Sequence, residues 1–377
     1  MALRLGFACH WGKDPVHTWS GTPWNLREAL RARVDTVDAG VEVPAAMRHG
    51  LRLASVRPTA TGLRSQWHHK RMAVDLLERD LRRKVTEARA DVLLEIQDLG
   101  AVETPFLVLQ DLSYELLFER FGADFPHFHA IGSRRLDELR RRQEQIYAQA
   151  SALLPMSQWL ASSLQRHGIP VERIRVVNPA MNVPMDTDRP MPVRREGPCL
   201  RLLMVGRDFD RKGGPQVVAA LNQLQKGWDR DVSLTVVGPS EWPMRGAVPA
   251  GVEFLGAQPA NRIGPLMDAH DLFVMPSLFE GFGIVFAEAL VRGLPCIGRD
   301  DCAMPEIIDR ETGGRLIRTE EPGELADTIV AALTDDSLYE ECGRLAQERA
   351  EHYSWGRAAQ EVVDVAGRVD AGDAPSG

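Results

Sequence analysis

The stretch PSLFEGFGIVFAEALVRGLPCIGRD, residues 276–300, determines which fold the chain is expected to have. The apolar residues 272–275 before it predict a short buried strand. Residues 284–292 predict a helix, which a following glycine ends. Between them, the sequence Glu-Gly-Phe-Gly at 280–283 has two glycines, which let a backbone approach a ligand closely. A loop leading into a helix N-terminus leaves backbone N–H groups unpaired, so this stretch predicts binding of phosphate or another anion.

Two carboxylates in this stretch are candidates for ligand binding. Glu280 lies in the loop and Glu288 in the predicted helix, eight positions later. That spacing is just over two helical turns, so both side chains are expected to reach one cleft at different depths. Carboxylates accept hydrogen bonds from hydroxyl groups, which suits a polyhydroxylated ligand. The alternative is a strand–loop–helix unit with solvated glutamates, and the two glycines argue against it.

At these residues the sequence resembles the family 4 retaining glycosyltransferases, which have the two-domain GT-B fold. The resemblance implies that Glu280 holds hydroxyls of the donor sugar and that Glu288 holds the ribose hydroxyls of the nucleotide. It places the backbone of Gly281, Phe282 and Gly283 along the donor sugar and the diphosphate.

A second strand-to-helix junction carries two cations. Residues 200–205 predict a strand, and Gly206, Arg207 and Lys212 follow before a helix that begins at a proline. Lysine is rare in this chain, with five occurrences, so its presence here is informative. Two fixed cations beside a helix N-terminus predict a diphosphate clamp, and the alternative is a solvated charge cluster. The resemblance assigns Arg207 and Lys212 to the donor diphosphate, with Gly206 beside them, and it places the nucleobase near Leu255.

The first half of the chain contains a tryptophan-rich loop after the predicted strand 3–8. Its three tryptophans suit either stacking on a sugar or anchoring of the loop to the sheet, and the sequence leaves both open. In the resembling family this loop carries glycines near the donor phosphate and the acceptor. Gly21, at the start of the helix expected over 25–33, is the candidate here.

The acceptor side is less clear. The predicted strand 106–109 ends at Gln110 and Asp111, where many family members have a histidine beside the reacting sugar. That role passes to Gln110, to Asp111 or to neither. Asp111 is a candidate to orient the acceptor hydroxyl or accept its proton, or else it caps the helix expected over 113–118. If Asp111 is only structural, the remaining candidates are His10, His17, Thr22 and Gln110.

Composition excludes several classes of protein. The 377 residues suffice for two domains, and 44% hydrophobic with 26% charged residues are typical of a soluble globular protein. The net charge of −8 argues against binding to nucleic acid. Five cysteines without a CxxC pair argue against a disulfide framework or a zinc site. Without a recognisable signal peptide or bilayer-spanning run, the cytoplasm is the expected location.

A basic helix is expected over 64–88. Some family members use such a helix to lie on an anionic membrane, but acidic residues interrupt this one. A solvated face is therefore favoured over membrane contact. The oligomeric state is left open between a monomer and a homodimer.

Strands alternate with helices in both halves, which predicts an α/β protein of two doubly wound Rossmann-like domains that face each other across a cleft. The expected parts are an N-terminal acceptor-side domain 1–183, a linker 184–198, a nucleotide-sugar domain 199–353, a helix 354–366 that packs back on the first domain, and a disordered tail 367–377.

The expected activity is transfer of a hexose from a nucleotide diphosphate sugar, UDP- or GDP-linked, to a hydroxyl of a small molecule or glycan. No cofactor or metal is expected, because cations are available for the diphosphate and Asp186-Thr187-Asp188 falls in the predicted linker. Retention is implied by the resemblance alone. The alternatives are a nucleotide-sugar epimerase, a sugar phosphorylase and a non-catalytic sugar-nucleotide-binding protein.

Overall fold

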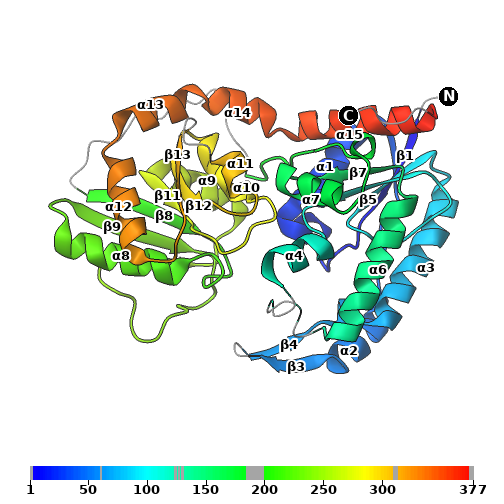
Figure 1. Ribbon diagram of the computed structural model, residues 1–377, viewed down its shortest axis with the longest axis horizontal. Helices are drawn as coiled ribbons and strands as arrows, with labels where there is room; N and C mark the ends of the chain where they lie inside the picture. Colours follow the sequence, from blue (N-terminus) through cyan, green and yellow to red (C-terminus); the bar gives the residue numbers. More distant parts are fainter. Residues whose placement is uncertain are drawn as a thin grey trace. The chain divides into compact units, whose positions relative to one another are not determined.

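The chain divides into two compact units, each with its own sheet (Figure 1). Unit 1 consists of Met1–Asn178 and Trp355–Gly377, and unit 2 of Pro179–Ser354. The computed structural model describes residues 3–59, 62–122, 125, 128, 131–183, 199–308 and 313–372. The linker predicted at 184–198 lies outside the described residues, so it stays a prediction.

Unit 1 is built on a five-stranded parallel sheet of order β2-β1-β5-β6-β7. Three of its strands are uninterrupted runs of buried residues, as expected for parallel strands covered on both faces. The strands are β1 Arg4–Ala8, β2 Asp35–Asp38, β5 Val92–Ile96, β6 Phe106–Gln110 and β7 Ala152–Pro155. The main helices of its first segment are η1 Pro15–Gly21, α1 Thr22–Arg31, α3 Arg71–Ala88, α4 Tyr114–Phe121, α6 Ser133–Gln149, α7 Gln158–Arg166 and η3 Val171–Arg173.

The region between β2 and α3 differs from the prediction. It contains α2 Ala45–Leu53 and an antiparallel pair, β3 Val56–Thr59 and β4 Gly62–Ser65, followed by η2 Trp67–His69. The helix predicted from residue 64 therefore begins at Arg71, because Gly62–Ser65 pairs with β3 instead. No described residue of α2 is fully buried, and this helix is not among those predicted from the sequence.

The last helix, α15 Trp355–Asp370, belongs to unit 1. Its apolar residues recur at helical spacing and pack with Leu26 and Leu30 of α1: Ala358, Ala359, Val362, Val365 and Ala366. This confirms that the last helix packs on the first domain. The helix runs to Asp370, so the tail predicted from 367 is partly helical, and residues 373–377 lie outside the described part.

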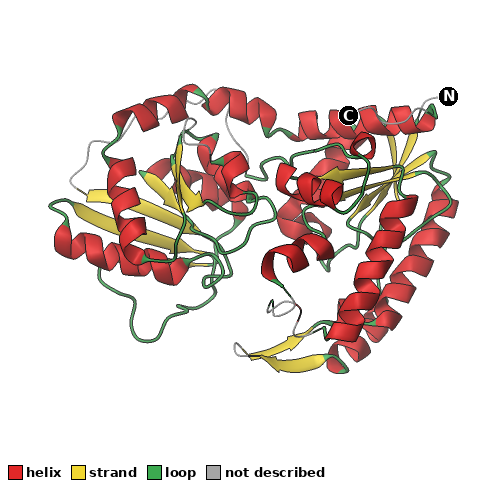
Figure 2. Ribbon diagram, in the orientation of Figure 1, coloured by secondary structure: helices red, strands yellow, loops and turns green. Residues whose placement is uncertain are grey.

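Unit 2 contains a six-stranded parallel sheet of order β10-β9-β8-β11-β12-β13 with helices on both faces (Figure 2). The strands are β8 Cys199–Val205, β9 Asp231–Val237, β10 Val252–Gly256, β11 Leu272–Val274, β12 Cys296–Arg299 and β13 Gly314–Ile317. The helices are α8 Gly214–Gly227, α9 Ala260–Ala269, α10 Ile284–Leu290, α11 Met304–Ile307, α12 Pro322–Leu333, α13 Asp336–Arg344 and α14 Ala346–His352. Two parallel sheets with flanking helices confirm two Rossmann-like domains.

Two helices of unit 2 differ from the prediction in extent. Helix α10 ends at Leu290 rather than 292, because Leu294 N donates back to Ala289 O and Gly293 takes a positive φ of 68°. Residues 339–352, for which the sequence predicts one helix, belong to two helices that meet at Leu345, two residues after Gly343, a weak helix former.

Candidate functional site

Glu280 lies in the loop after β11 and is buried there. Its Oε1 accepts a hydrogen bond from Ser277 Oγ at 2.6 Å and an ion-paired hydrogen bond from Lys212 Nζ. Arg211 Nη1 lies 3.5 Å from the same oxygen. Two predicted site residues that are far apart in the sequence are thus in direct contact at the carboxyl edge of the unit 2 sheet.

Glycines allow this contact. A Cβ on Gly206 would lie 2.9 Å from Lys212 Cγ, so a side chain there would displace the lysine. Gly213 takes a positive φ of 79°, and a Cβ on it would lie 2.6 Å from Pro276 O. The loop after β8 and the loop after β11 therefore pack closely because both glycines lack a side chain.

Arg207 follows β8 and its side chain is exposed. Unlike Lys212, it forms no hydrogen bond or ion pair with another residue in the described part of the chain. A guanidinium in this state retains all five N–H donors for a ligand. The structure thus gives the two predicted cations different surroundings, one paired and one exposed.

Glu288 is buried in α10, where its Oε1 accepts the backbone N–H groups of Asn182 at 2.9 Å and Val183 at 3.1 Å. Burial raises the pKa of the Glu288 carboxyl, and these two hydrogen bonds oppose the shift. No local pattern in the sequence indicates this contact, because the partners lie 105 and 106 positions away. Glu288 Oε1 therefore stabilises the backbone at residues 182–183.

The candidates for ligand contact in unit 2 also include Phe282, Gly283 and Leu255, and their surroundings differ. Phe282 is buried and its ring lies edge-on to Tyr353, with 6.1 Å between the ring centroids. Gly283, with a φ of 99°, is the residue from which α10 begins. Leu255 is partly buried against the core at the end of β10. At Phe282 only the backbone is therefore a candidate for ligand contact.

Sequence reasoning missed Arg299, a buried residue at the end of β12. Its guanidinium donates to Ser277 O at 3.2 Å, Pro276 O at 3.2 Å, Thr319 O at 2.9 Å and Gln216 Oε1 at 3.0 Å. The arginine thereby connects the loop that carries Glu280 to α8 and to the segment after β13. The one available signal in the sequence was a charged residue that closely follows the apolar residues 294–297.

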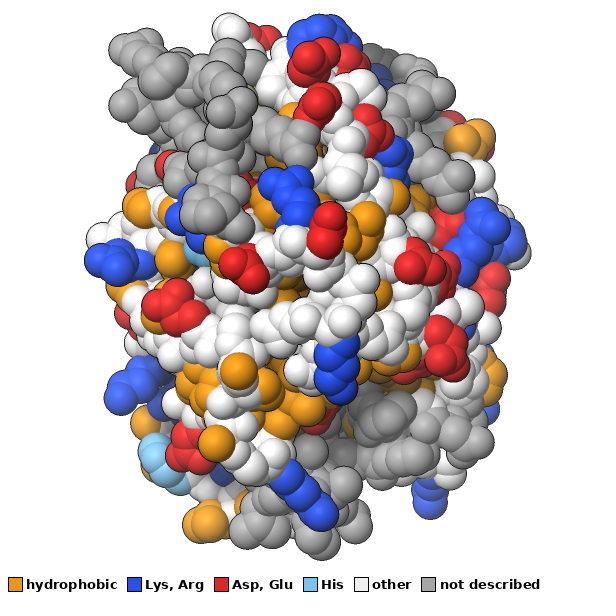
Figure 3. Space-filling view, turned by 90° about the vertical axis from the view of Figure 1, so that its left-hand side faces the viewer, with side chains coloured by type: hydrophobic (Ala, Val, Ile, Leu, Met, Phe, Trp, Pro, Cys, Tyr) orange, Lys and Arg blue, Asp and Glu red, His pale blue; other side chains and the backbone are white. Residues whose placement is uncertain are grey.

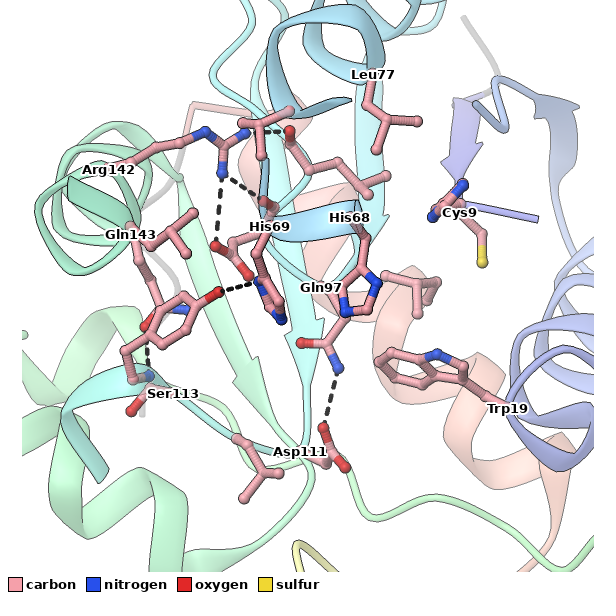
Figure 4. A pocket seen from close by; sticks show the side chains of 18 of the residues that line it. Cys9, Trp19, His68, His69, Leu77, Gln97, Asp111, Ser113, Arg142 and Gln143 are labelled. Carbon is pink, nitrogen blue, oxygen red and sulfur yellow. Dashed lines mark hydrogen bonds and ion pairs between the residues drawn. The ribbon is translucent and has the colours of Figure 1, made fainter. Parts of the chain in front are cut away.

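In unit 1, Asp111 lies at a cavity of about 500 Å³ at the carboxyl ends of β1, β5 and β6 (Figure 4). Asp111 Oδ1 accepts a hydrogen bond from Gln97 Nε2 at 3.0 Å. The cap of α4 is Ser113, whose Oγ accepts from Leu116 N at 3.0 Å, so the alternative that Asp111 caps this helix is wrong. Gln110 is buried and donates to the Tyr147 hydroxyl, so its side chain does not line the cavity.

The three tryptophans of the first loop have different surroundings. Trp11 is buried, and Trp24 lies edge-on to it with the Arg27 guanidinium 4.4 Å from the Trp24 ring centroid. Trp19 is 44% exposed and lines the cavity. Trp11 and Trp24 therefore anchor the loop, whereas Trp19 faces the cavity, and stacking of Trp19 on a sugar stays a prediction.

Backbone conformation places Trp19 at the cavity. Trp19, Ser20 and Gly21 have consecutive positive φ values of 48°, 58° and 95°, which reverse the chain just before α1. Gly21 itself is buried as the N-terminal cap of α1. Of the other acceptor-side candidates, His10 lines the cavity, His17 is exposed and contacts Asp14, and Thr22 is buried.

The described residues contain no group of three or more His, Cys, Asp or Glu side chains that could hold a metal ion. Asp186 and Asp188 lie outside the described part. The five cysteines are free, as expected from their number and spacing. Within the described part, no helix is long and apolar enough to cross a bilayer. Acidic and basic side chains are interspersed over the face shown in Figure 3.

Residues 199–335 match the family model described as "Glycosyl transferases group 1". The chain carries a group 1 glycosyltransferase domain. This glycosyltransferase domain begins at β8 and includes every site candidate of unit 2. The resemblance to family 4 glycosyltransferases is thereby confirmed.

Known proteins support the same relationship. The chain is 28% identical over 242 residues to a putative colanic acid biosynthesis glycosyltransferase, WcaL, of Escherichia coli, and this alignment covers 60% of this chain and 59% of WcaL. The alignments with this and two further relatives span 39–59% of those proteins.

Two solved structures show the fold over the full chain. Sucrose-phosphate synthase from Thermosynechococcus elongatus has a TM-score of 0.70 at 16% identity, covering 98% of this chain and 100% of that one. Anabaena HepE in complex with UDP and glucose has a TM-score of 0.63 at 16% identity, covering 96% and 98%. The fold is GT-B.

Proposed function

We propose that this protein is a metal-independent retaining glycosyltransferase that moves a hexose from a UDP- or GDP-sugar to an acceptor hydroxyl. The observation that carries the proposal is the contact between Lys212 and Glu280, with Arg207 exposed beside it, at one edge of the group 1 domain. Retention and the hexose come from the family resemblance.

The proposed chemistry breaks the C–O bond between the sugar and the diphosphate and forms a C–O bond to the acceptor. Negative charge develops on the leaving diphosphate, and fixed cations stabilise it more in the transition state than in the ground state. A lysine ammonium has three N–H donors, so Lys212 can keep Glu280 and bind a phosphate oxygen at once. Arg207 supplies further donors, and Asp111 accepts the acceptor proton.

Glu280 and Glu288 have separate proposed roles. Glu280 binds hydroxyls of the donor sugar, and Oε2 of Glu288, the oxygen that does not accept from Asn182 and Val183, binds the ribose hydroxyls. Glu280→Gln is expected to weaken binding of the sugar nucleotide only, whereas Glu288→Gln weakens the free nucleotide as well. Calorimetry with UDP and with the UDP-sugar separates the two, and equal losses of free nucleotide would contradict the assignment.

The donor is identified by thermal shift against UDP-, GDP- and ADP-sugars. A ligand that binds only the native state raises the free energy of unfolding, by about 2.7 kcal/mol when its concentration is a hundred times its dissociation constant. The melting temperature rises as a result. The proposal expects one base to give the largest shift and then to support transfer. A chain that binds no sugar nucleotide would refute it.

Metal independence has its own test. Turnover is expected to survive EDTA, because cationic side chains take the place of a divalent ion at the diphosphate. Loss of activity in EDTA that magnesium or manganese restores would overturn this part. The cytoplasmic location expected from the sequence stays a prediction.

A further inference from the structure

The cavity of unit 1 has few charges available to a ligand. Arg142 is the only lysine or arginine among the described residues that line it, and the two lining carboxylates are Asp98 and Asp111. Burial lowers the pKa of His10, and the positive charge of the nearby Arg48 lowers it further, so the neutral form is favoured. The cavity therefore offers no excess of positive charge.

Both terminal nitrogens of the Arg142 guanidinium already bind groups of the protein, and its Nε is buried without a hydrogen-bond partner in the described part of the chain. Nη1 donates to Asp98 O at 3.0 Å and lies 3.7 Å from Asp98 Oδ2. Nη2 donates to Leu99 O and lies 3.6 Å from Glu78 Oε2. Two carboxylates thus balance this cation, and its donors support the turn after β5. In Figure 4, Arg142 lies away from the side where Trp19 and Asp111 are found.

The other walls are aromatic and aliphatic. Trp67 lies edge-on to His10 and to His68, with 5.9 Å between ring centroids in each case, and Trp19 is exposed beside them. The aliphatic part consists of Val74, Leu77, Ile96, Leu99, Leu112, Leu117 and Leu139. Flat aromatic rings suit the apolar face of a ring-shaped ligand. The volume falls within the range of about 300–1,000 Å³ for small-molecule sites.

We propose that this cavity selects an uncharged acceptor, in which a hydroxylated ring stacks on Trp19 next to Asp111 and an attached apolar group occupies the leucine-lined part. The inference rests on the proposed transferase function and names its acceptor class. A phosphorylated ring is disfavoured, because a phosphate would lie near Asp111 while the cation of the cavity is already paired.

The test measures direct binding by calorimetry, without a donor, at about pH 8, where an imidazole of ordinary pKa is neutral. The probes are phenyl glucoside, methyl glucoside and phenyl glucoside phosphorylated on its primary hydroxyl. Phenyl glucoside is expected to bind most tightly, and the phosphorylated probe at least about 10-fold more weakly. Binding of the phosphorylated probe as tightly as phenyl glucoside, or of no probe at all, would overturn the inference.

Variants locate the binding. Trp19→Ala is expected to weaken phenyl glucoside binding by about 2- to 12-fold, and Trp19→Phe to retain most of it. Val16→Ala, an exposed position in the same 3₁₀ helix that does not line the cavity, is the matched control. Equal binding by Trp19→Ala and the wild type would contradict the stacking role.

A charge variant tests the selection itself. Asp111→Asn removes the carboxylate near which the phosphate of the probe would lie, and asparagine keeps an oxygen that can accept from Gln97. The phosphorylated probe should gain affinity relative to phenyl glucoside by about 10-fold. An unchanged ratio would refute the charge argument. Binding of sugar nucleotides is measured in separate experiments. If the glucoside tests fail, only the acceptor inference is refuted, whereas a chain that binds no sugar nucleotide refutes the proposed transferase function.

Discussion

The candidate donor loops of unit 2 and the cavity of unit 1 are built in different ways. The donor loops are positioned by main-chain geometry, in which Gly206 and Gly213 permit close packing and Arg299 binds three carbonyl groups. The cavity is formed by side chains from many separate elements, and Trp19 projects into it from a loop of positive φ.

This difference explains where similarity to other proteins is found. Main-chain geometry requires particular residues at fixed spacing, and the family model matches 199–335, which contains those loops. A cavity lined by side chains can keep its architecture while its chemistry changes. Donor-side variants are thus expected to have large effects on stability and nucleotide binding, and cavity variants to affect mainly the acceptor.

The largest expected effect is on stability, from Arg299→Met. Pro276 O, Ser277 O and Gln216 Oε1 would lose their donor, whereas Thr319 O keeps Gln216 Nε2. Each buried unpaired group costs about 1–3 kcal/mol, so the free energy of unfolding should fall by at least about 3 kcal/mol. Urea unfolding measures this. The control is Arg318→Met, an exposed arginine paired with Asp300, for which about 0–1 kcal/mol is expected. Similar losses in both variants would contradict the role of Arg299.

Lys212→Ala tests the donor side directly. A charge-assisted hydrogen bond to phosphate is worth about 1.5–3 kcal/mol, so the dissociation constant of the nucleotide diphosphate should rise about 10- to 100-fold and turnover should fall. Lys226→Ala, an exposed lysine near the end of the adjacent helix α8, is the control. If calorimetry shows unchanged nucleotide binding, Lys212 is not part of a diphosphate clamp.

Asp111→Asn tests the acceptor side. Asparagine retains an oxygen that can accept from Gln97, so the melting temperature and donor hydrolysis should be retained. Transfer to the acceptor should fall at least about tenfold if the carboxylate handles a proton. Steady-state transfer assays decide the matter, and unchanged transfer would assign Asp111 a structural role.

Glu95→Gln is expected to change the pH dependence of stability. Glu95 is fully buried, its Oε2 accepts from Leu99 N and Gly100 N, and burial raises its pKa well above the usual 4.5. The native state therefore binds a proton that the unfolded state releases, so this contribution is complete below pH 4.5 and is lost as pH rises through the native pKa. The variant should flatten this fall by up to about 1.4 kcal/mol per pH unit.

Melting temperatures across this pH range measure the effect. Glu87→Gln, an exposed residue that pairs with Arg83, is the control and should keep the wild-type slope. Parallel curves for the wild type and Glu95→Gln would show that the Glu95 proton is not linked to folding.

The strands and the loops that follow them could be predicted from the sequence where a local pattern of residues defines them. Strands such as β5, β6 and β8 are continuous apolar runs, and the loops after β8 and β11 carry glycines and charges in a recognisable spacing. Prediction failed where long-range contacts decide. The contact of Glu288 with Asn182 and the four hydrogen bonds of Arg299 join segments that no local pattern relates. Helix α2 was missed although apolar residues recur at helical spacing in its nine residues.

The placement of α15 has a consequence for synthesis. Unit 2 is inserted into unit 1, so the chain passes from one unit to the other after Asn178 and after Ser354. Two hydrogen bonds join the segments at these junctions: Met181 N donates to Tyr353 O at 3.0 Å, and Arg357 Nη2 donates to Asn178 O at 2.7 Å. A ribosome adds about 5–20 residues per second, so the whole of unit 2 emerges before the helix that covers Leu26 and Leu30 exists. The nascent first unit therefore carries an exposed apolar strip until α15 has been synthesised, whereas unit 2, residues 179–354, is one uninterrupted piece of chain.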